Sequence, residues 1–411
     1  MIALMLQHEA AKDSLERKAQ RPQGARRDVV VCLDSTCPSL SSLFILHARP
    51  QKLAILKCLK QNGFTLTKGK HLMITIDGSF GEGGGQIIRT ACALSLITGK
   101  PFRIYNVRAR RAKPGLQRQH LTAVNAAAEI GEAKVDGAAV GSQEFTFTPG
   151  KVTPGDYTFS IGTAGSTTLV LQTVLPPLMI ANASSRLTLE GGTHNVHAPP
   201  FEFLKKTFLP LVNRTGPHVS IELERYGFYP PGGGRFHVTI EPGDSRNRID
   251  LTERGDILAR RARALVVNLP PNIAERELGV IREMLGWDDS ELQLETSNNA
   301  FSPGNVLTIE IESEQLTEVI TGIGERGVRA ETIAERVVKE TQDYLSHNAP
   351  VGEHLADQLL IPLALAGGGS YLTGPLSTHT TTNIEIIKKF LSVDITVMPA
   401  GDEMCRIEVR L

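Results

Sequence analysis

From residue 73 onward, the chain repeats one pattern of apolar and polar positions. A segment with apolar residues at i, i+3 and i+4 is followed by two segments in which apolar and polar residues alternate, with a turn between them. The first kind of spacing predicts a helix with one covered face, and the alternation predicts strands of a sheet that is covered on one face. The pattern recurs in residues 118–150, 201–242 and 383–411. It is preceded at Met73 by a strand, a glycine-rich loop and the start of a helix.

A fourth and more charged version of the pattern lies between residues 255 and 327. We interpret it as a smaller inserted α/β domain. Residues 73–254 and 328–411 would then form a large domain of repeated helix–strand–turn–strand units, which resumes with a helix over 328–346. The predicted fold class is α/β (α+β), with helix-backed sheets and clefts where the units meet.

Residues 1–72 differ in character from the rest. They show no strand–helix rhythm, contain more than twice as many basic as acidic residues, and hold three of the five cysteines. We predict that Met73 is the true start and that residues 1–72 are an N-terminal extension that is disordered or not native. A real basic arm is the alternative.

Composition narrows the class of protein. Lys plus Arg and Asp plus Glu both number 44, which argues against a histone-like binder of nucleic acid but allows a local basic groove. The five cysteines lack the spacing of a disulfide framework or a zinc site, so we expect a cytoplasmic protein. No apolar run approaches the roughly 20 residues of a membrane span, so we expect no membrane partner.

The glycine-rich segment 78–86 lies between a predicted strand and a predicted helix. Glycines let backbone amides approach a phosphate closely, and a helix N-terminus favours negative charge. The segment lacks the Gly-Lys-Ser/Thr of a Walker A loop and is not a Rossmann fingerprint. Glu82 within it suits a divalent metal that neutralises phosphates. A tight turn with a solvated glutamate is the alternative.

A basic segment follows, from Arg103 to Arg118, with six basic residues and no acidic one. Arginine makes bidentate contacts to phosphate, so such a segment suits a polyanion. Aromatic residues for base stacking are nearly absent there, which favours contacts to a nucleic-acid backbone and a terminal phosphate over base readout. A solvated face is the alternative.

The C-terminal third offers a candidate nucleophile. Asp357 and Gln358 open a helix that then becomes apolar, and His379 lies between Thr378 and Thr380 ahead of the last helix. An imidazole among short polar side chains near a helix N-terminus can act as a nucleophile with one nitrogen free. A neighbour of an N-cap is the alternative.

Other candidate ligands are weaker. His194 and His197 are three residues apart, but no cysteine or carboxylate close in the sequence completes a metal site. Cys92 lies within an apolar helix and is expected in the core.

Six segments occur in an order that resembles the RNA 3'-terminal phosphate cyclase family: DGSFGEGGGQIIRTACALSLITGKPFRI, RAKPGLQRQHLTAV, GGTHNVHAPP, GFYPPGGG, EHLADQLLIPLALAGGG and THTTTN. The resemblance covers residues 73–411 almost without gaps. It implies that a histidine attacks the α-phosphate of ATP, that AMP then passes to an RNA 3'-phosphate, and that the adjacent 2'-hydroxyl closes a 2',3'-cyclic phosphate. ATP as co-substrate, Mg²⁺ or Mn²⁺, and RNA 3'-phosphate ends are thereby implied.

The resemblance also assigns roles to single residues. The nucleophile falls on His379 and the metal ligand on Glu82. The implied ATP contacts are Gln172, His354, Leu355, Ala356, Asp357 and Gln358. The implied contacts to phosphates and the RNA end are Arg89, Arg108, Arg111, Gln119 and His120. His354 stands where some members carry a tyrosine that stacks on adenine.

Two rival classes share features with this chain. A non-catalytic cyclase-like ribosome assembly protein has the same fold but lacks the nucleophilic histidine, so His379 and Glu82 favour a ligase-class, RNA-processing enzyme. An enolpyruvyl transferase also has sheet-and-helix repeats, but it does not need the THTTTN or HLADQ segments.

Overall fold

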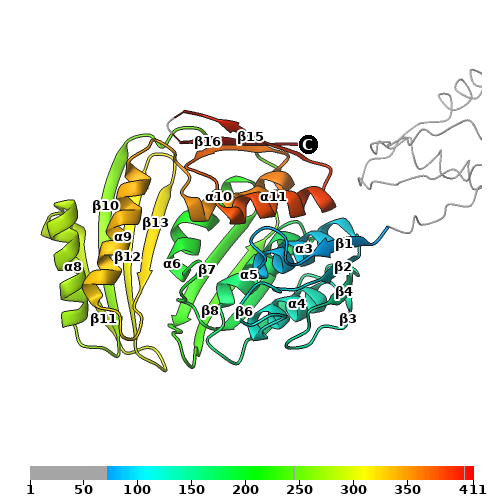
Figure 1. The fold of residues 1–411 in the computed structure, drawn as a ribbon, viewed down its shortest axis with the longest axis horizontal. Coiled ribbons are helices and arrows are strands. Elements are labelled where there is room, and N and C mark those ends of the chain that lie inside the picture. Colours follow the sequence, from blue (N-terminus) through cyan, green and yellow to red (C-terminus); the bar gives the residue numbers. More distant parts are fainter. Residues whose placement is uncertain (1–71, 244–245, 402) are drawn as a thin grey trace, which may run out of the picture. The chain divides into compact units, whose positions relative to one another are not determined.

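The computed structural model describes residues 72–243, 246–401 and 403–411 (Figure 1). The predicted extension, residues 1–72, lies outside this part of the chain except for Leu72. Among the described residues, no helix combines the length and the apolar character that crossing a bilayer would need.

In the described part of the chain there are four four-stranded sheets, and three of them share one topology. Each of the three runs strand, helix, parallel strand, helix and antiparallel hairpin, and each has the sheet order first, second, fourth, third. The first repeat consists of β1 (Ile74–Asp77), α3 (Gly85–Thr98), β2 (Phe102–Tyr105), α4 (Arg118–Ile130), β3 (Lys134–Asp136) and β4 (Phe145–Thr148).

The other two repeats follow the same order. The second consists of β5 (Asp156–Ser160), α5 (Thr167–Met179), β6 (Ser185–Gly191), the continuous helix α6 (Phe201–Phe203), η1 (Leu204–Phe208) and α7 (Leu209–Arg214), β7 (His218–Arg225) and β8 (Gly234–Glu241). The third consists of β9 (Ile249–Leu251), α10 (Glu353–Ala366), β14 (Gly369–Thr373), α11 (Thr378–Phe390), β15 (Asp394–Pro399) and β16 (Cys405–Arg410).

The sequence pattern predicted the second half of each repeat, which is a helix followed by a hairpin. It did not predict that the first half, a strand, a helix and a parallel strand, also repeats. The first helices α3, α5 and α10 are buried on most of their surface, so they carry no clear alternation between an apolar and a polar face. Cys92 in α3 is fully buried, as predicted.

The third repeat is interrupted between β9 and α10 by a separate sheet of order β11-β10-β12-β13. Two helices cover this sheet, and they lie together with it at the left of Figure 1. The elements are β10 (Ile257–Val267), α8 (Asn272–Leu285), η2 (Asp289–Glu291), β11 (Leu292–Ser297), β12 (Gly304–Ser313), β13 (Thr317–Ile323) and α9 (Ala330–Leu345).

Helix α9 was expected to resume the large domain. Instead it packs against α8 and β13, and its Ala334, Val337 and Val338 belong to the core of the small sheet together with Trp287. The glycine-rich segment before α9 looks like a domain linker, but it only turns the chain from strand to helix. We therefore propose that the inserted unit extends from β10 to α9.

The three repeats share one hydrophobic core. Each first helix packs against the second helix of another repeat: α5 contacts α4, α3 contacts α11, and α10 contacts η1. Polar residues on the first helices are therefore brought face to face with residues of a different repeat.

Arg254 joins the two segments through which the chain enters and leaves the insertion. Its guanidinium group donates hydrogen bonds to the carbonyl oxygens of Tyr344, His347 and Ala349 at 2.7, 2.6 and 3.0 Å. It also lies 4.1 Å from the centroid of the Tyr344 ring, and Arg254 is only 7% exposed. The end of α9 leaves carbonyl groups without partners inside the helix, and this cation satisfies one of them.

The substitution Arg254→Ala should lower the free energy of unfolding by about 3 kcal/mol, because buried carbonyls lose charge-assisted partners. Urea denaturation would measure the loss. As a matched control, Arg248→Ala removes an exposed arginine that pairs with Asp250 and should cost less than about 1 kcal/mol. Equal effects of the two changes would contradict the structural role of Arg254.

Candidate active site

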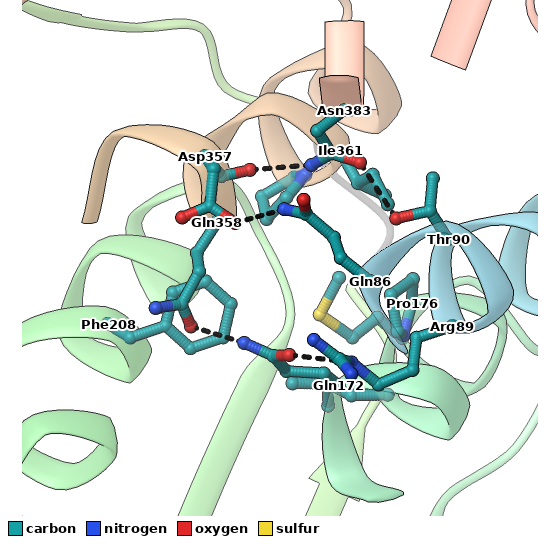
Figure 2. A pocket seen from close by; sticks show the side chains of 13 residues that line it. Gln86, Arg89, Thr90, Gln172, Pro176, Phe208, Asp357, Gln358, Ile361 and Asn383 are labelled. Carbon is teal, nitrogen blue, oxygen red and sulfur yellow. Dashed lines mark hydrogen bonds between the residues drawn. The ribbon is translucent and has the colours of Figure 1, made fainter. Parts of the chain in front are cut away.

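One pocket lies where α3, α5, η1, α10 and α11 meet (Figure 2). Three repeats contribute to its wall, and polar side chains alternate there with apolar ones. The lining residues are Gln86, Arg89, Thr90, Gln172, Leu175, Pro176, Met179, Phe208, Asp357, Gln358, Ile361, Pro362 and Asn383.

A hydrogen-bonded series at this pocket orients His379. The side-chain amide of Gln86 donates to Asp357 Oδ2, and Gln86 Oε1 lies 3.3 Å from His379 Nδ1. An ionised carboxylate only accepts hydrogen bonds, so it holds the NH₂ group of Gln86 and turns the amide oxygen toward the imidazole. His379 Nδ1 then carries the proton, and the lone pair of Nε2 is free. His379 is an exposed residue beside the pocket and is not part of its lining.

The two titratable groups of this series have shifted pKa values. Desolvation and the nearby charges of Arg89 and Arg111 lower the pKa of His379, although Glu82 opposes them. The imidazole is therefore neutral near neutral pH. Burial raises the pKa of Asp357 to about 7 against the opposing charge of Arg89.

The backbone around Asp357 is tied to the neighbouring helices. Asn383 of α11 donates to the Asp357 carbonyl oxygen at 2.8 Å and accepts from the Thr90 hydroxyl of α3 at 2.7 Å. The first and third repeats are thus joined at the point where the histidine is oriented.

A second series of hydrogen bonds joins all three repeats. Arg89 Nε donates to Gln172 Oε1 at 3.2 Å, and Gln172 Nε2 donates to Gln358 Oε1 at 2.7 Å. Gln358 Nε2 in turn donates to the carbonyl oxygen of His354 at 2.7 Å. The first two of these bonds, Arg89 to Gln172 and Gln172 to Gln358, appear as dashed lines in Figure 2. Arg89 therefore points its charge into the pocket from a fixed position.

The glycine-rich loop docks on the start of α11. The backbone N–H of Glu82 donates to Thr382 Oγ1 at 2.9 Å. Gly81 has φ +55°, and a methyl group at this position would lie 2.1 Å from Thr382 Oγ1, so only glycine fits. The carboxylate of Glu82 accepts from Gly84 N at 2.6 Å and from Arg111 at 2.7 Å. The solvated glutamate considered from the sequence is wrong, because this side chain is only 8% exposed.

His120 is neutral and carries its proton on Nε2. Its Nδ1 accepts the backbone N–H of Gln117 at 3.1 Å at the start of α4, which leaves the proton on Nε2. Burial, with the charges of Arg108 and Arg89, lowers the pKa of His120 to about 3. A methyl group at Gly85 would lie 2.6 Å from His120 Nε2 and 2.9 Å from Arg89 Nη1, so both nitrogens border the start of α3.

Two further candidate phosphate contacts, Arg108 and Gln119, make hydrogen bonds to backbone groups. Arg108 donates to the carbonyl oxygens of Lys113 and Gly115 at 2.6 and 3.0 Å and so closes its own loop. Gln119 Oε1 accepts from Ser166 N at 3.1 Å, which connects α4 to α5.

Three details differ from the sequence-based expectations. Helix α11 begins at Thr378, so His379 lies in its first turn and not ahead of it. Helix α10 begins at Glu353, so Asp357 and Gln358 lie one turn inside the helix. The side chains of the predicted ATP contacts Leu355 and Ala356 are buried in the core and do not line the pocket.

His354 is separated from the pocket wall. Its side chain is 68% exposed, and Nε2 lies 3.3 Å from Glu340 Oε1 of α9. The hydrogen bond to that carboxylate raises the pKa of His354.

His194 has a structural partner that the sequence did not reveal. Its Nε2 lies 2.6 Å from Glu202 Oε2, and Arg263 also donates to Glu202 at 2.7 Å. Within the described residues, no cluster of three or more His, Cys, Asp or Glu side chains could hold a metal ion.

The role of Gln86 and Thr90 was missed, although the sequence contains a signal for it. With Arg89 they occupy positions i, i+3 and i+4 in the first two turns of a largely apolar helix. Such a polar stripe in a buried helix marks a face that needs polar partners.

Comparison with known proteins supports the resemblance. A family model described as RNA 3'-terminal phosphate cyclase matches residues 80–397. The chain is 51% identical over 333 residues to a Koribacter versatilis protein named RNA 3'-terminal phosphate cyclase, covering 81% of this chain and 93% of the relative. A protein of that name from Ectopseudomonas mendocina is 48% identical over 337 residues, covering 82% and 98%. The chain therefore belongs to the RNA 3'-terminal phosphate cyclase family.

Proposed function

We propose that this chain uses ATP to convert an RNA 3'-terminal phosphate to a 2',3'-cyclic phosphate, through a covalent histidine–AMP intermediate on His379. Membership of the family supports the overall cyclase reaction and the use of ATP. The observation that supports the covalent route is the orientation of His379, whose Nδ1 faces Gln86 and whose Nε2 is free. We place the reaction in the cytoplasm, in keeping with the lack of disulfide spacing among the cysteines.

The first step forms a bond between His379 Nε2 and the α-phosphorus of ATP while the bond to pyrophosphate breaks. The imidazole gains positive charge as it attacks, and Gln86 accepts from Nδ1–H in a position that the Asp357 carboxylate holds. This acceptor stabilises the charged ring more than the neutral one, which favours the transition state.

Positive charge for the triphosphate comes from fixed donors. Arg89 is held by Gln172, and the Nε2–H of His120 borders the same start of α3. A charged guanidinium and a neutral N–H donor aimed at one point suit phosphate oxygens.

The residues present fit a divalent ion bound mainly by phosphate. Mg²⁺ in such sites uses one or two carboxylates together with substrate phosphates and water. Glu82 would supply the carboxylate, since each of its oxygens keeps a lone pair beyond the one used by Gly84 or Arg111. When bound, the ion would neutralise charge on the phosphates.

In the later steps the RNA 3'-phosphate takes AMP from His379, and the free imidazole is restored. The vicinal 2'-hydroxyl then attacks the activated phosphorus, the bond to AMP breaks, and the hydroxyl proton is released. A phosphate dianion is a poor electrophile, and AMP is a good leaving group. The attack is intramolecular, so it gains from a high effective molarity.

The substitution His379→Ala should abolish the uptake of AMP from ATP labelled at the α-phosphate. The ring makes a single side-chain hydrogen bond and is exposed, so the variant should fold with an unchanged thermal midpoint. Exposed His218 offers a matched control, because His218→Ala should leave AMP uptake intact. Labelling of the His379 variant at the normal rate would overturn the assignment.

The substitution Gln86→Met keeps the side-chain volume but removes the acceptor for Nδ1. The rate of AMP uptake should fall about tenfold to a hundredfold with little change in KM for ATP, because one charge-assisted hydrogen bond of the transition state is lost. Gln293 on the small sheet is exposed, and Gln293→Met should have no effect. A change confined to KM would contradict a positioning role.

The rate of AMP uptake should decrease as the pH falls through about 7, where Asp357 gains a proton. Protonated Asp357 no longer serves only as an acceptor, so it stops fixing the orientation of Gln86. His379, with its lowered pKa, loses its lone pair only at a lower pH. The variant Asp357→Asn should be slower and should lack the transition near pH 7. If the transition near pH 7 persists in the Asp357→Asn variant, it belongs to another titratable group.

A further inference from the structure

Two aromatic side chains are unusually exposed on neighbouring loops. Tyr229, in the turn between β7 and β8, is 81% exposed, and Phe301, between β11 and β12, is 68% exposed. Large aromatic rings gain much by burial, so exposure to this degree leaves a favourable binding surface unused.

The Phe301 ring is held in place from behind. The guanidinium carbon of Arg225 lies 4.1 Å from its centroid, and Arg225 Nε donates to the carbonyl oxygen of Gly233 at 2.6 Å. A methyl group at Gly233 would lie 2.2 Å from Phe301 Cδ2, so glycine there lets the ring lie close against the turn. A ring that is already ordered loses little conformational entropy when a ligand stacks on it.

The loop that carries Phe301 is fastened to the turn that carries Tyr229. Tyr226 N donates to the Asn299 carbonyl oxygen at 3.1 Å. Asn299 Nδ2 donates to the Glu224 carbonyl oxygen at 2.7 Å, and Ser302 donates to the Phe228 carbonyl oxygen at 3.3 Å. The two aromatic residues therefore belong to one surface, although the inserted unit supplies only one of them.

This surface continues to the candidate phosphate site. A methyl group at Gly232 would lie 2.6 Å from the carbonyl oxygen of Thr163. The loop containing Thr163 leads to Ser166, which donates to Gln119. Gln172 of the pocket lies six residues beyond Ser166 on α5, or about 9 Å along the helix.

Arg225 places a positive charge beside Phe301, where it can attract an anionic chain. The carboxylates of Glu190 and Glu224 on the adjacent strands share a single arginine, Arg235, and Glu224 also pairs with His237. The basic segment 103–118, which directly precedes Gln119, contains positive charge but almost no aromatic residues. The aromatic surface supplies the stacking rings that this segment lacks.

We propose that Tyr229 and Phe301, with Arg225 behind the ring, form a stacking platform for the bases of single-stranded RNA that precede the 3'-phosphate. The inference rests on the proposed function, because it takes the RNA end to lie beside His379. Stacking on aromatic rings tolerates any base. The platform would thus bind the RNA chain without selecting a sequence.

The double variant Tyr229→Ala/Phe301→Ala tests this platform with two substrates that both end in a 3'-phosphate, a dodecanucleotide and a dinucleotide. KM for the dodecanucleotide should rise about tenfold or more, as expected when base stacking is lost. KM for the dinucleotide, which lacks further upstream bases to stack, should stay within about twofold, and AMP uptake from ATP alone should be unchanged.

Two control variants make the result decisive. Tyr229→Phe/Phe301→Tyr keeps both rings and should behave as wild type. Leu258→Ala removes an apolar residue of the small unit that is 61% exposed and should leave both KM values unchanged. An unchanged KM for the dodecanucleotide in the Ala variant, or an equal rise for both substrates, would overturn the platform.

A binding measurement separates this inference from the proposed function. Fluorescence anisotropy with a labelled dodecanucleotide that ends in a 3'-hydroxyl needs no catalysis. Suppose that the Ala variant binds this oligonucleotide more weakly than the wild type, and that the wild type takes up no AMP. This result would overturn the histidine–AMP route and support the platform. Equal binding by variant and wild type would overturn the platform whatever the catalytic result.

Discussion

The hydrogen bond between Gln86 and Asp357 is the contact on which the site depends. Its two partners belong to the first and third repeats, which are separated by most of the chain. The imidazole of His379 is oriented only when these repeats are packed together, because the amide of Gln86 has no fixed direction without the carboxylate. Packing of the large core and orientation of the His379 ring are therefore coupled.

The same principle explains why the polar groups of the pocket occur in pairs. A buried amide or hydroxyl without a partner is costly, so a polar residue on a buried helix stabilises the fold only when another repeat supplies its partner. Gln172 meets Gln358, and Thr90 meets Asn383. These pairs specify how the repeats fit together, and they leave Arg89 and His379 with free polar atoms.

Much of the fold could be predicted from alternation in the sequence, because the hairpins and second helices each have one covered face. The first helices of the repeats, α3, α5 and α10, were not predicted to be repeating elements, because burial on most sides removes the periodic signal. The family resemblance predicted roles for His379 and Glu82, but no local pattern could pair Gln86 with a carboxylate in a distant repeat. The sequence-based prediction ended the small unit before α9, because α9 follows a glycine-rich turn, whereas we propose that the unit includes this helix.

Arg254 has a consequence for the history of the chain. The points at which the polypeptide leaves the third sheet and returns to it lie within reach of a single side chain. A gene segment encoding β10 to α9 could thus be gained or lost in one event, with no change in the strand order of the host sheet.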